Sequence, residues 1–196
     1  KVSGYGATIS LFSGLGPVVS CLQSGGALDG VDFCKISGIV FKEDSIAVGT
    51  IGVDAASTAR LILQDVRMEK YDIALMIPNA QFCTAYSLKT YDCNVGIYMR
   101  PDLAGGGANS WSFYDHQAVS CNTCAVLINN KSVFPNHSIY FRNPSWLGNT
   151  AVALAVFDSN VYVDGGAPES NNPADSVVFD GVTIPKSGIY ANRSQV

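Results

Sequence analysis

Residues 177–184 read VVFDGVTI, and this stretch decides the fold class that the sequence predicts. Asp180 and Gly181 separate two short runs of β-branched and aromatic residues. An Asp-Gly pair between such runs is a strong hairpin signal, because both turn residues need a positive φ. The stretch therefore predicts an antiparallel β-hairpin.

Similar apolar runs recur along the rest of the chain, and most stop at a pair of turn residues such as Pro78-Asn79 or Asn143-Pro144. The strands expected from them span residues 36–41, 46–53, 71–77, 95–99, 138–141, 151–157 and 160–163. Residues 54–65 alone could be helical, and we expect a short helical turn there that leads into a strand over 60–67. No repeat of fixed period stands out. The pattern predicts one all-β domain over residues 1–196, an antiparallel β-sandwich or jelly roll with long loops and at most one short helix.

The N-terminal segment 1–16 has two interpretations. It alternates apolar and small residues in places and is bounded by Gly14 and Gly16. It could extend from the body and add a donor-type strand to the sheet edge of a neighbouring subunit. It could equally be the first strand of the chain's own sheet.

Charge is scarce in this chain. Charged residues make up 14% and hydrophobic residues 47%, and the formal net charge is −4. The 12 Lys and Arg residues never cluster, which excludes nucleic acid and an anionic membrane surface as partners. The longest apolar run, 151–157, is too short to cross a bilayer, so we expect no membrane insertion. The chain opens on polar and turn residues, as expected of a mature exported protein or of a fragment of a longer precursor.

The six cysteines fall into three close pairs, and the predicted disulfides are Cys21–Cys34, Cys83–Cys93 and Cys121–Cys124. Such short bridges would stiffen loops on a fold that already has enough apolar residues for a core. Together with the low charge they place the protein outside the cell, secreted or at the cell surface. The alternative is six buried thiols in a cytosolic protein.

Metal and redox chemistry find little support. Cys121 and Cys124 have Cys-x-x-Cys spacing, but the residues that follow favour a strand instead of the helix that activates such a thiol. A zinc ribbon would need a second Cys-x-x-Cys, and a calcium loop over 158–165 lacks its sixth-position glycine. We therefore expect no metal and no cofactor.

Catalytic signatures are also missing. The chain has two histidines, His116 and His137, but no Gly-x-Ser-x-Gly motif that would supply a nucleophilic serine. The three glutamates form no pair of the kind that glycosidases use. We expect no catalytic residues and no enzyme, with a secreted hydrolase kept as a third class of function.

The best candidate for ligand binding is the stretch 105–116, GGGANSWSFYDH, and the stretch 142–146, RNPSW, is a second candidate of the same kind. Aromatic side chains can cover the C–H surface of a sugar, and rigid aromatics also dominate protein interfaces. Alternatively, Trp111 and Phe113 are core residues of an ordinary strand. The predicted ligand-binding residues are Asn109, Trp111, Tyr114, Asp115, His116 and Trp146.

Three asparagines match the N-glycosylation pattern: Asn130, Asn136 and Asn192. They are candidate modification sites where the host glycosylates exported proteins.

The function predicted from these features is an extracellular, non-enzymatic β-module that acts as an adhesin and binds a cell-surface glycan or a protein receptor. The alternative is a structural subunit that assembles with identical subunits, either in a pilus-like filament by strand exchange through 1–16 or in a capsid. Composition and strand rhythm are similar to those of fimbrial adhesins and viral jelly rolls, but no shared motif assigns a role to any residue.

Overall fold

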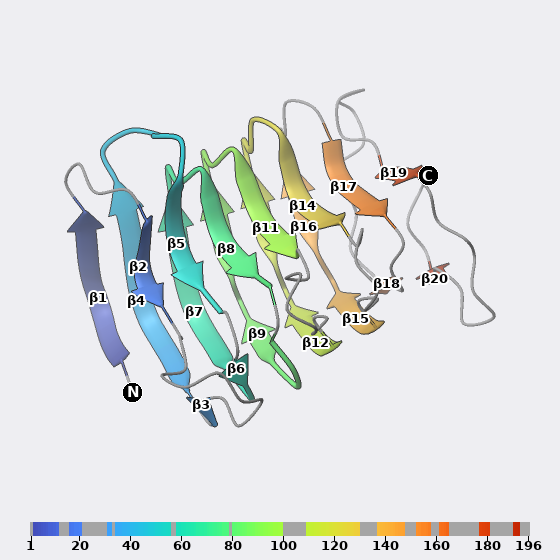
Figure 1. Cartoon of the computed structure of the whole chain (residues 1–196), viewed down its shortest axis with the longest axis horizontal. Helices are drawn as coiled ribbons and strands as arrows, with labels where there is room; N and C mark the ends of the chain where they lie inside the picture. The colour runs from blue at the N-terminus through green and yellow to red at the C-terminus, as the bar shows by residue number, and fades with distance from the viewer. Residues whose placement is uncertain are drawn as a thin grey trace.

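The chain forms a parallel β-solenoid, in which it winds through repeated coils that stack along one axis (Figure 1). The computed structural model describes residues 2–11, 16–20, 31–32, 34–55, 58–78, 80–99, 109–129, 137–147, 152–157, 161–164, 177–180 and 190–192. Every strand pair within these residues is parallel.

Two long sheets face each other, and the chain passes from one to the other in each coil. Sheet A contains β1 (Val2–Leu11), β4 (Lys35–Glu43), β7 (Ile62–Glu69), β9 (Thr84–Tyr86), β10 (Lys89–Tyr91), β12 (Asn109–Tyr114), β13 (Gln117–Val119), β15 (His137–Arg142), β16 (Ser145–Leu147), β18 (Val161–Asp164) and β20 (Tyr190–Asn192). Sheet B contains β2 (Gly16–Ser20), β5 (Thr50–Asp54), β8 (Ile73–Ile77), β11 (Val95–Met99), β14 (Cys124–Asn129), β17 (Val152–Phe157) and β19 (Val177–Asp180). A third, two-stranded sheet pairs β3 (Val31–Asp32) with β6 (Thr58–Ala59).

The coils keep a common register although their lengths differ. Leu63 follows its partner Ile36 by 27 residues, Ala85 follows Leu63 by 22, and Phe113 follows Ala85 by 28. The register holds because each coil turns at equivalent positions, whatever the length of the connection elsewhere. Side chains at the same position of successive coils therefore stack in columns along the axis.

The antiparallel sandwich expected from the sequence is wrong, because sheets A and B are parallel throughout the described residues. Asp180 ends β19, which pairs in parallel with β17, and residues 181–189 lie outside the described part of the chain. Most of the expected strands overlap observed ones, since 95–99 is β11 and 138–141 lies within β15, but of the strand expected over 46–53 only residues 50–53 are strand, in β5. Apolar runs ended by turn residues are shared by parallel and antiparallel sheets, so local pattern did not distinguish them.

Two further expectations concern the N-terminal half of the chain. Where a helical turn was expected, the described residues of 54–65 include the end of β5, β6 and the start of β7, and no helix occurs in the described chain. β1 pairs in parallel with β4, so it is a strand of the chain's own sheet A.

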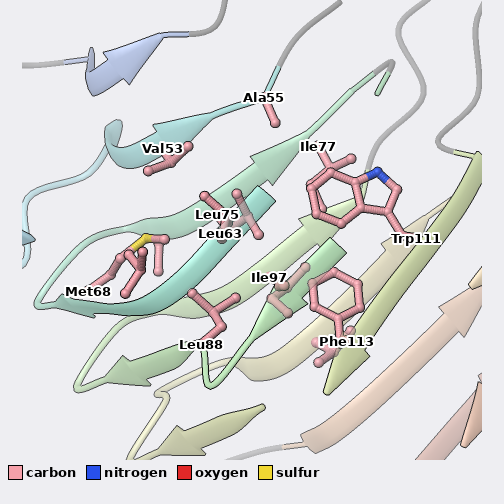
Figure 2. Close-up of a cluster of buried hydrophobic side chains, with 14 of the residues drawn as sticks. Val53, Ala55, Leu63, Met68, Leu75, Ile77, Leu88, Ile97, Trp111 and Phe113 are labelled. Atoms are coloured by element: carbon pink, nitrogen blue, oxygen red, sulfur yellow. The ribbon is translucent and has the colours of Figure 1, made fainter. Parts of the chain in front are cut away.

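The core fills the space between the two sheets with apolar side chains (Figure 2). Leu63 and Phe113 from sheet A, and Leu75 and Ile97 from sheet B, are fully buried or nearly so. The Phe113 and Phe141 rings of successive coils stack at 4.7 Å, and Trp111 packs on Phe113 at 5.3 Å. Removing this apolar surface from water supplies most of the stabilisation, at about 25 cal/mol per Å².

Residues with a positive φ mark the corners of the coils. One such column bends sheet A in its middle: Asp65, Ser87, Asp115 and Asn143, with φ between 50° and 54°. Another ends the sheet at Lys70, Asp92 and Ser120. The amide of Ser87 donates to Tyr114 O at 2.9 Å, and that of Asp115 donates to Arg142 O at 3.0 Å. The bend is therefore hydrogen-bonded from coil to coil, and Asp and Asn suit it because they tolerate this backbone region.

Candidate functional site

The bend of sheet A forms an open groove on the outer surface, with a volume of about 530 Å³. Its lining is almost wholly polar and comes from four coils: Asp65, Ser87, Lys89, Asp115, Gln117, Asn143, Pro144 and Ser145.

Two columns build this groove. The corner column supplies Asp65, Ser87, Asp115 and Asn143, one from each coil. The residues two positions later supply Lys89, Gln117 and Ser145, which are aligned by the in-register pairing of β10, β13 and β16. Neighbouring strands lie about 4.8 Å apart, so the groove presents a polar group at that interval along the axis.

Hydrogen bonds orient part of the lining. Nδ2 of Asn143 donates to Oδ1 of Asp115 at 2.7 Å, which ties two successive coils at the surface. The Tyr91 hydroxyl donates to Oε1 of Gln117 at 3.4 Å, a long contact that leaves the Gln117 amide nitrogen available. The groove thus combines carboxylate acceptors with amide and ammonium donors.

Two tyrosines stack on the outer surface of sheet A, next to the corner column. Tyr86 and Tyr114 occupy the position just before the corner, and their rings are 5.0 Å apart and nearly parallel. The Arg142 guanidinium lies 5.8 Å from the centre of the Tyr114 ring. Tyr86 is 44% exposed. Because each ring covers the face of the next, this stack offers ring edges and hydroxyl groups to a ligand.

The predicted ligand-binding residues fall into two groups. Asp115 lines the groove, and Tyr114 lies beside it in sequence with its side chain partly exposed. Trp111, His116 and Trp146 lie in the core, with 0%, 0% and 3% exposure. Their side chains offer no surface to a ligand, which is the core alternative stated for Trp111. The Asn109 backbone opens β12 and pairs in register with His137.

The buried aromatic residues form hydrogen bonds within the core. Trp111 Nε1 donates to Ala80 O at 3.1 Å, and Trp146 Nε1 donates to His116 Nδ1 at 3.1 Å. Since Nδ1 accepts this bond, the His116 proton resides on Nε2, which has no hydrogen-bond partner among the described residues. Burial lowers the pKa of His116 to about 3, so the ring is neutral at physiological pH and serves the core.

The predicted disulfides are not present among the described cysteines. Cys34, Cys83, Cys93, Cys121 and Cys124 are all thiols, and Cys21 lies outside the described residues. Cys83 precedes β9 and Cys93 follows β10, so the width of sheet A separates the expected pair.

The thiol contacts explain why Cys121 and Cys124 do not join either. Cys124 Sγ donates to Val126 O at 2.8 Å inside sheet B. Cys121 lies beside Cys93 of the preceding coil, so these two thiols are the nearest alternative pair. Residues in register on neighbouring parallel strands have Cβ atoms about 4.8 Å apart, a longer distance than the ~3.8 Å between the Cβ atoms of a disulfide. Burial raises the pKa of Cys93 to about 12 and that of Cys121 to about 11. These thiols are protonated and poorly nucleophilic.

Other sequence candidates lie apart from the groove. Within the described residues, no group of three His, Cys, Asp or Glu side chains could hold a metal ion. Asn192 ends β20, whereas Asn130 and Asn136 lie outside the described residues. No helix of the described chain is long and apolar enough to span a membrane.

A second polar ladder lies at a different corner, where sheet A leads into sheet B. Asn94 Nδ2 donates to Asp72 Oδ1 at 2.8 Å, and Asn122 Nδ2 donates to Asn94 Oδ1 at 3.1 Å. The Gly49 amide donates to Asp72 Oδ2 at 2.8 Å. This ladder uses its polar atoms on itself and therefore acts as a structural tie between coils.

The sequence analysis missed Asp65, Ser87, Lys89 and Gln117, and it named Asn143, Pro144 and Ser145 only as part of the second candidate stretch 142–146. The signal for them was the recurrence of polar residues at intervals of 28, as in 87, 115 and 143 and again in 89, 117 and 145. The 22-residue coil before Ser87 breaks the period and concealed it.

Comparison with known proteins gives no relative: no family model, no curated protein and no solved structure matches this chain.

Proposed function

We propose that the groove of sheet A binds an extended glycan, so that the protein is a glycan-binding module. The observation that carries this proposal is the convergence of polar side chains from successive coils on one open groove. A glycan is a chain of repeating units rich in hydroxyl groups. A groove that repeats its donors and acceptors along one axis suits such a ligand.

The chemistry of the lining supports hydroxyl recognition. Asp65 and Asp115 accept hydrogen bonds from sugar hydroxyls, while Lys89 and the Gln117 amide donate to hydroxyl or ring oxygens. Asn143 holds the Asp115 carboxylate by its 2.7 Å hydrogen bond, which reduces the entropy lost when a ligand orders that side chain.

Electrostatics favours a neutral glycan. Among the lining residues, two carboxylates face one ammonium group, at Asp65, Asp115 and Lys89. An anionic polymer would meet net repulsion there, and binding of acidic polymers needs an excess of basic groups. The ligand we propose is therefore an uncharged glycan of a cell surface.

The proposed setting is extracellular. The support for it is the low charged fraction of 14%. The described cysteines form no disulfide and therefore do not add to this support. Activity as an enzyme is not part of this proposal.

The test is a panel of neutral and acidic glycans, measured by calorimetry against the wild-type chain and two matched variants. Asp115→Ala removes a groove carboxylate, and Asp44→Ala removes an exposed carboxylate away from the groove. We expect a neutral glycan to bind and Asp115→Ala to weaken it about tenfold or more, the cost of one charge-assisted hydrogen bond. Asp44→Ala should leave the affinity unchanged. Absence of binding to every glycan, or equal loss in both variants, would refute the proposal.

A further inference from the structure

The groove on sheet A has two polar sides that run along the solenoid axis. One side is the corner column, which supplies one residue from each of four coils: Asp65, Ser87, Asp115 and Asn143. The other side is the in-register column of β10, β13 and β16: Lys89, Gln117 and Ser145. The residues between the two columns point inward, as the fully buried Leu88 and His116 show. A ligand in the groove therefore lies between two rows of polar groups.

The polar lining has a defined end at the first coil. The corner position of β4 is occupied by Gly38, which has a φ of 63° and is level with Asp65. The second column continues from Lys89 through Arg67 to Val40. Gly38 has no side chain and Val40 has no polar group. The row of polar contacts in the described coils therefore begins at Asp65.

The coil of Asp65 contributes to one side of the groove only. Arg67 occupies the second column in that coil, but it is absent from the groove lining. Its guanidinium forms an ion pair with Glu69 and lies 4.3 Å from the centre of the Tyr91 ring. Asp65 is consequently the terminal contact of the row.

Carboxylates alternate with a neutral group in the corner column. Asp65 and Asp115 are two coils apart, and Ser87 lies between them. Neighbouring strands are about 4.8 Å apart, so these two carboxylates recur after about 9.6 Å. In a straight glycan with equatorial linkages, each pyranose unit is turned over relative to the one before, so the same edge of the chain returns after two units. Each unit also advances the chain by nearly one strand separation. The spacing of the carboxylates thus matches the repeat of such a chain.

We propose that the groove binds a straight, neutral glycan of the β-1,4-linked type, parallel to the solenoid axis, with one sugar unit on each of the four coils from Asp65 to Asn143. This inference rests on the proposed glycan binding and adds the linkage, the direction and the number of bound units. Glycans with α-1,4 linkages curl into helices. They would leave a straight row of contacts after a few units.

The experiment is isothermal titration calorimetry of the full chain with oligosaccharides of two to six units. The β-1,4-linked probes are cello-, manno- and xylo-oligosaccharides, and malto-oligosaccharides are the α-1,4-linked probe. We expect the dissociation constant of a β-1,4-linked series to fall about threefold to tenfold with each unit up to four, which is the contribution of about one hydrogen bond per unit. Further units should change it little, because the fifth unit meets Gly38 and Val40.

A gain-of-binding variant tests the end of the groove. Gly38→Asn with Val40→Gln gives the first coil two polar side chains, and Asn suits that corner because Asn143 has the same sign of φ. This variant should bind five-unit ligands about threefold to tenfold more tightly than the wild type. The control variant, Thr84→Asn with Ile62→Gln, places the same two side chains on neighbouring strands of sheet A outside the groove lining. It should leave every affinity unchanged.

A loss-of-binding variant provides a second measurement that does not depend on the first. Asp65→Gly removes the terminal contact and suits the φ of 52° at that corner. It should abolish the gain that the fourth unit gives and leave the affinity for three-unit ligands unchanged. Circular dichroism and thermal melting report whether each variant folds.

The outcomes separate this inference from the proposed function. Affinity that does not depend on length, that keeps rising beyond four units or that favours malto-oligosaccharides overturns the inference and leaves glycan binding in place. An equal gain in the control variant, or no gain in a folded Gly38→Asn, Val40→Gln variant, also overturns it alone. Absence of binding to every glycan refutes the proposed function and the inference with it.

Discussion

Asn143 donates a 2.7 Å hydrogen bond to Asp115 of the preceding coil, and both residues have a positive φ at the bend of sheet A. The same two residues line the groove. The bend of the sheet and the polarity of the groove therefore depend on the same side chains.

The first prediction concerns that contact. Asn143→Asp replaces the donor with a second carboxylate beside Asp115, on a backbone conformation that Asp also tolerates. Like charges on adjacent strands repel, so we expect the free energy of unfolding to fall by up to about 1 kcal/mol at neutral pH, a small value because both groups are exposed. Urea denaturation of the two proteins at pH 7 and pH 4 measures it.

The sign of the pH effect is the control for this prediction. Protonating either carboxyl group removes the repulsion, so the difference between variant and wild type should shrink as the pH falls through the carboxyl range. A difference that stays the same at pH 4 would show that lost packing, and not charge, causes the destabilisation.

The second prediction concerns Gly96 on β11, which lies close to the next coil. A Cβ atom there would be 2.5 Å from Ala125 O and 2.7 Å from Thr90 Oγ1. We expect Gly96→Ala to lower the free energy of unfolding by about 1–3 kcal/mol, the usual cost of overpacking. Chemical denaturation checks it.

A double variant separates the two contacts of Gly96. Thr90→Ala with Gly96→Ala removes the side-chain contact but leaves the contact with the Ala125 carbonyl, which belongs to the strand ladder. We therefore expect the double variant to remain less stable than Thr90→Ala alone. Equal stability of these two proteins would show that the backbone contact is relieved without cost.

Strand positions could be predicted from the sequence because apolar runs and turn residues are local signals, as β11 and β15 show. The partner of each strand could not, because Asp180 and Gly181 read as a hairpin turn whether or not the next strand turns back. The stacked positions 65, 87, 115 and 143 are separated by 22, 28 and 28 residues. Coils of unequal length conceal such a repeat from a search for one fixed period.

The candidate site could be predicted only in small part for the same reason. Tyr114 and Asp115 stood out because they follow Trp111 and Phe113 in an aromatic stretch. Strand alternation was the alternative stated for that stretch, and it places Trp111 and Phe113 inside and Tyr114 outside. Lys89 and Gln117 join the site only because β10 and β13 are in register, which no local pattern shows.

The third prediction follows from the thiols. Cys83, Cys93, Cys121 and Cys124 are buried, so iodoacetamide should label them only after unfolding, whereas partly exposed Cys34 should be labelled first. Peptide mass spectrometry of the labelled native protein measures the order. A reductant should leave the melting temperature unchanged, and a decrease would indicate that a disulfide stabilises the fold.

The fourth prediction uses the buried His116. Its pKa is about 3 in the folded protein and 6.5 when unperturbed, because burial disfavours the charged ring. The unfolded state therefore binds the proton more tightly, and acid favours unfolding. Stability from this group should be complete above pH 6.5 and should decrease as the pH falls from 6.5 towards 3. The slope is up to about 1.4 kcal/mol per pH unit for one proton, and urea denaturation at successive pH values measures it.

The variant His116→Phe isolates this proton. It removes the acceptor for Trp146 Nε1 and leaves that buried donor unpaired, so we expect a loss of about 1–3 kcal/mol at pH 7. Its stability should nevertheless decrease less steeply with acid than that of the wild type, so the two curves should converge between pH 6.5 and pH 4. Parallel curves would mean that His116 is not the group that titrates, and that the carboxyl groups alone determine the acid sensitivity of the solenoid.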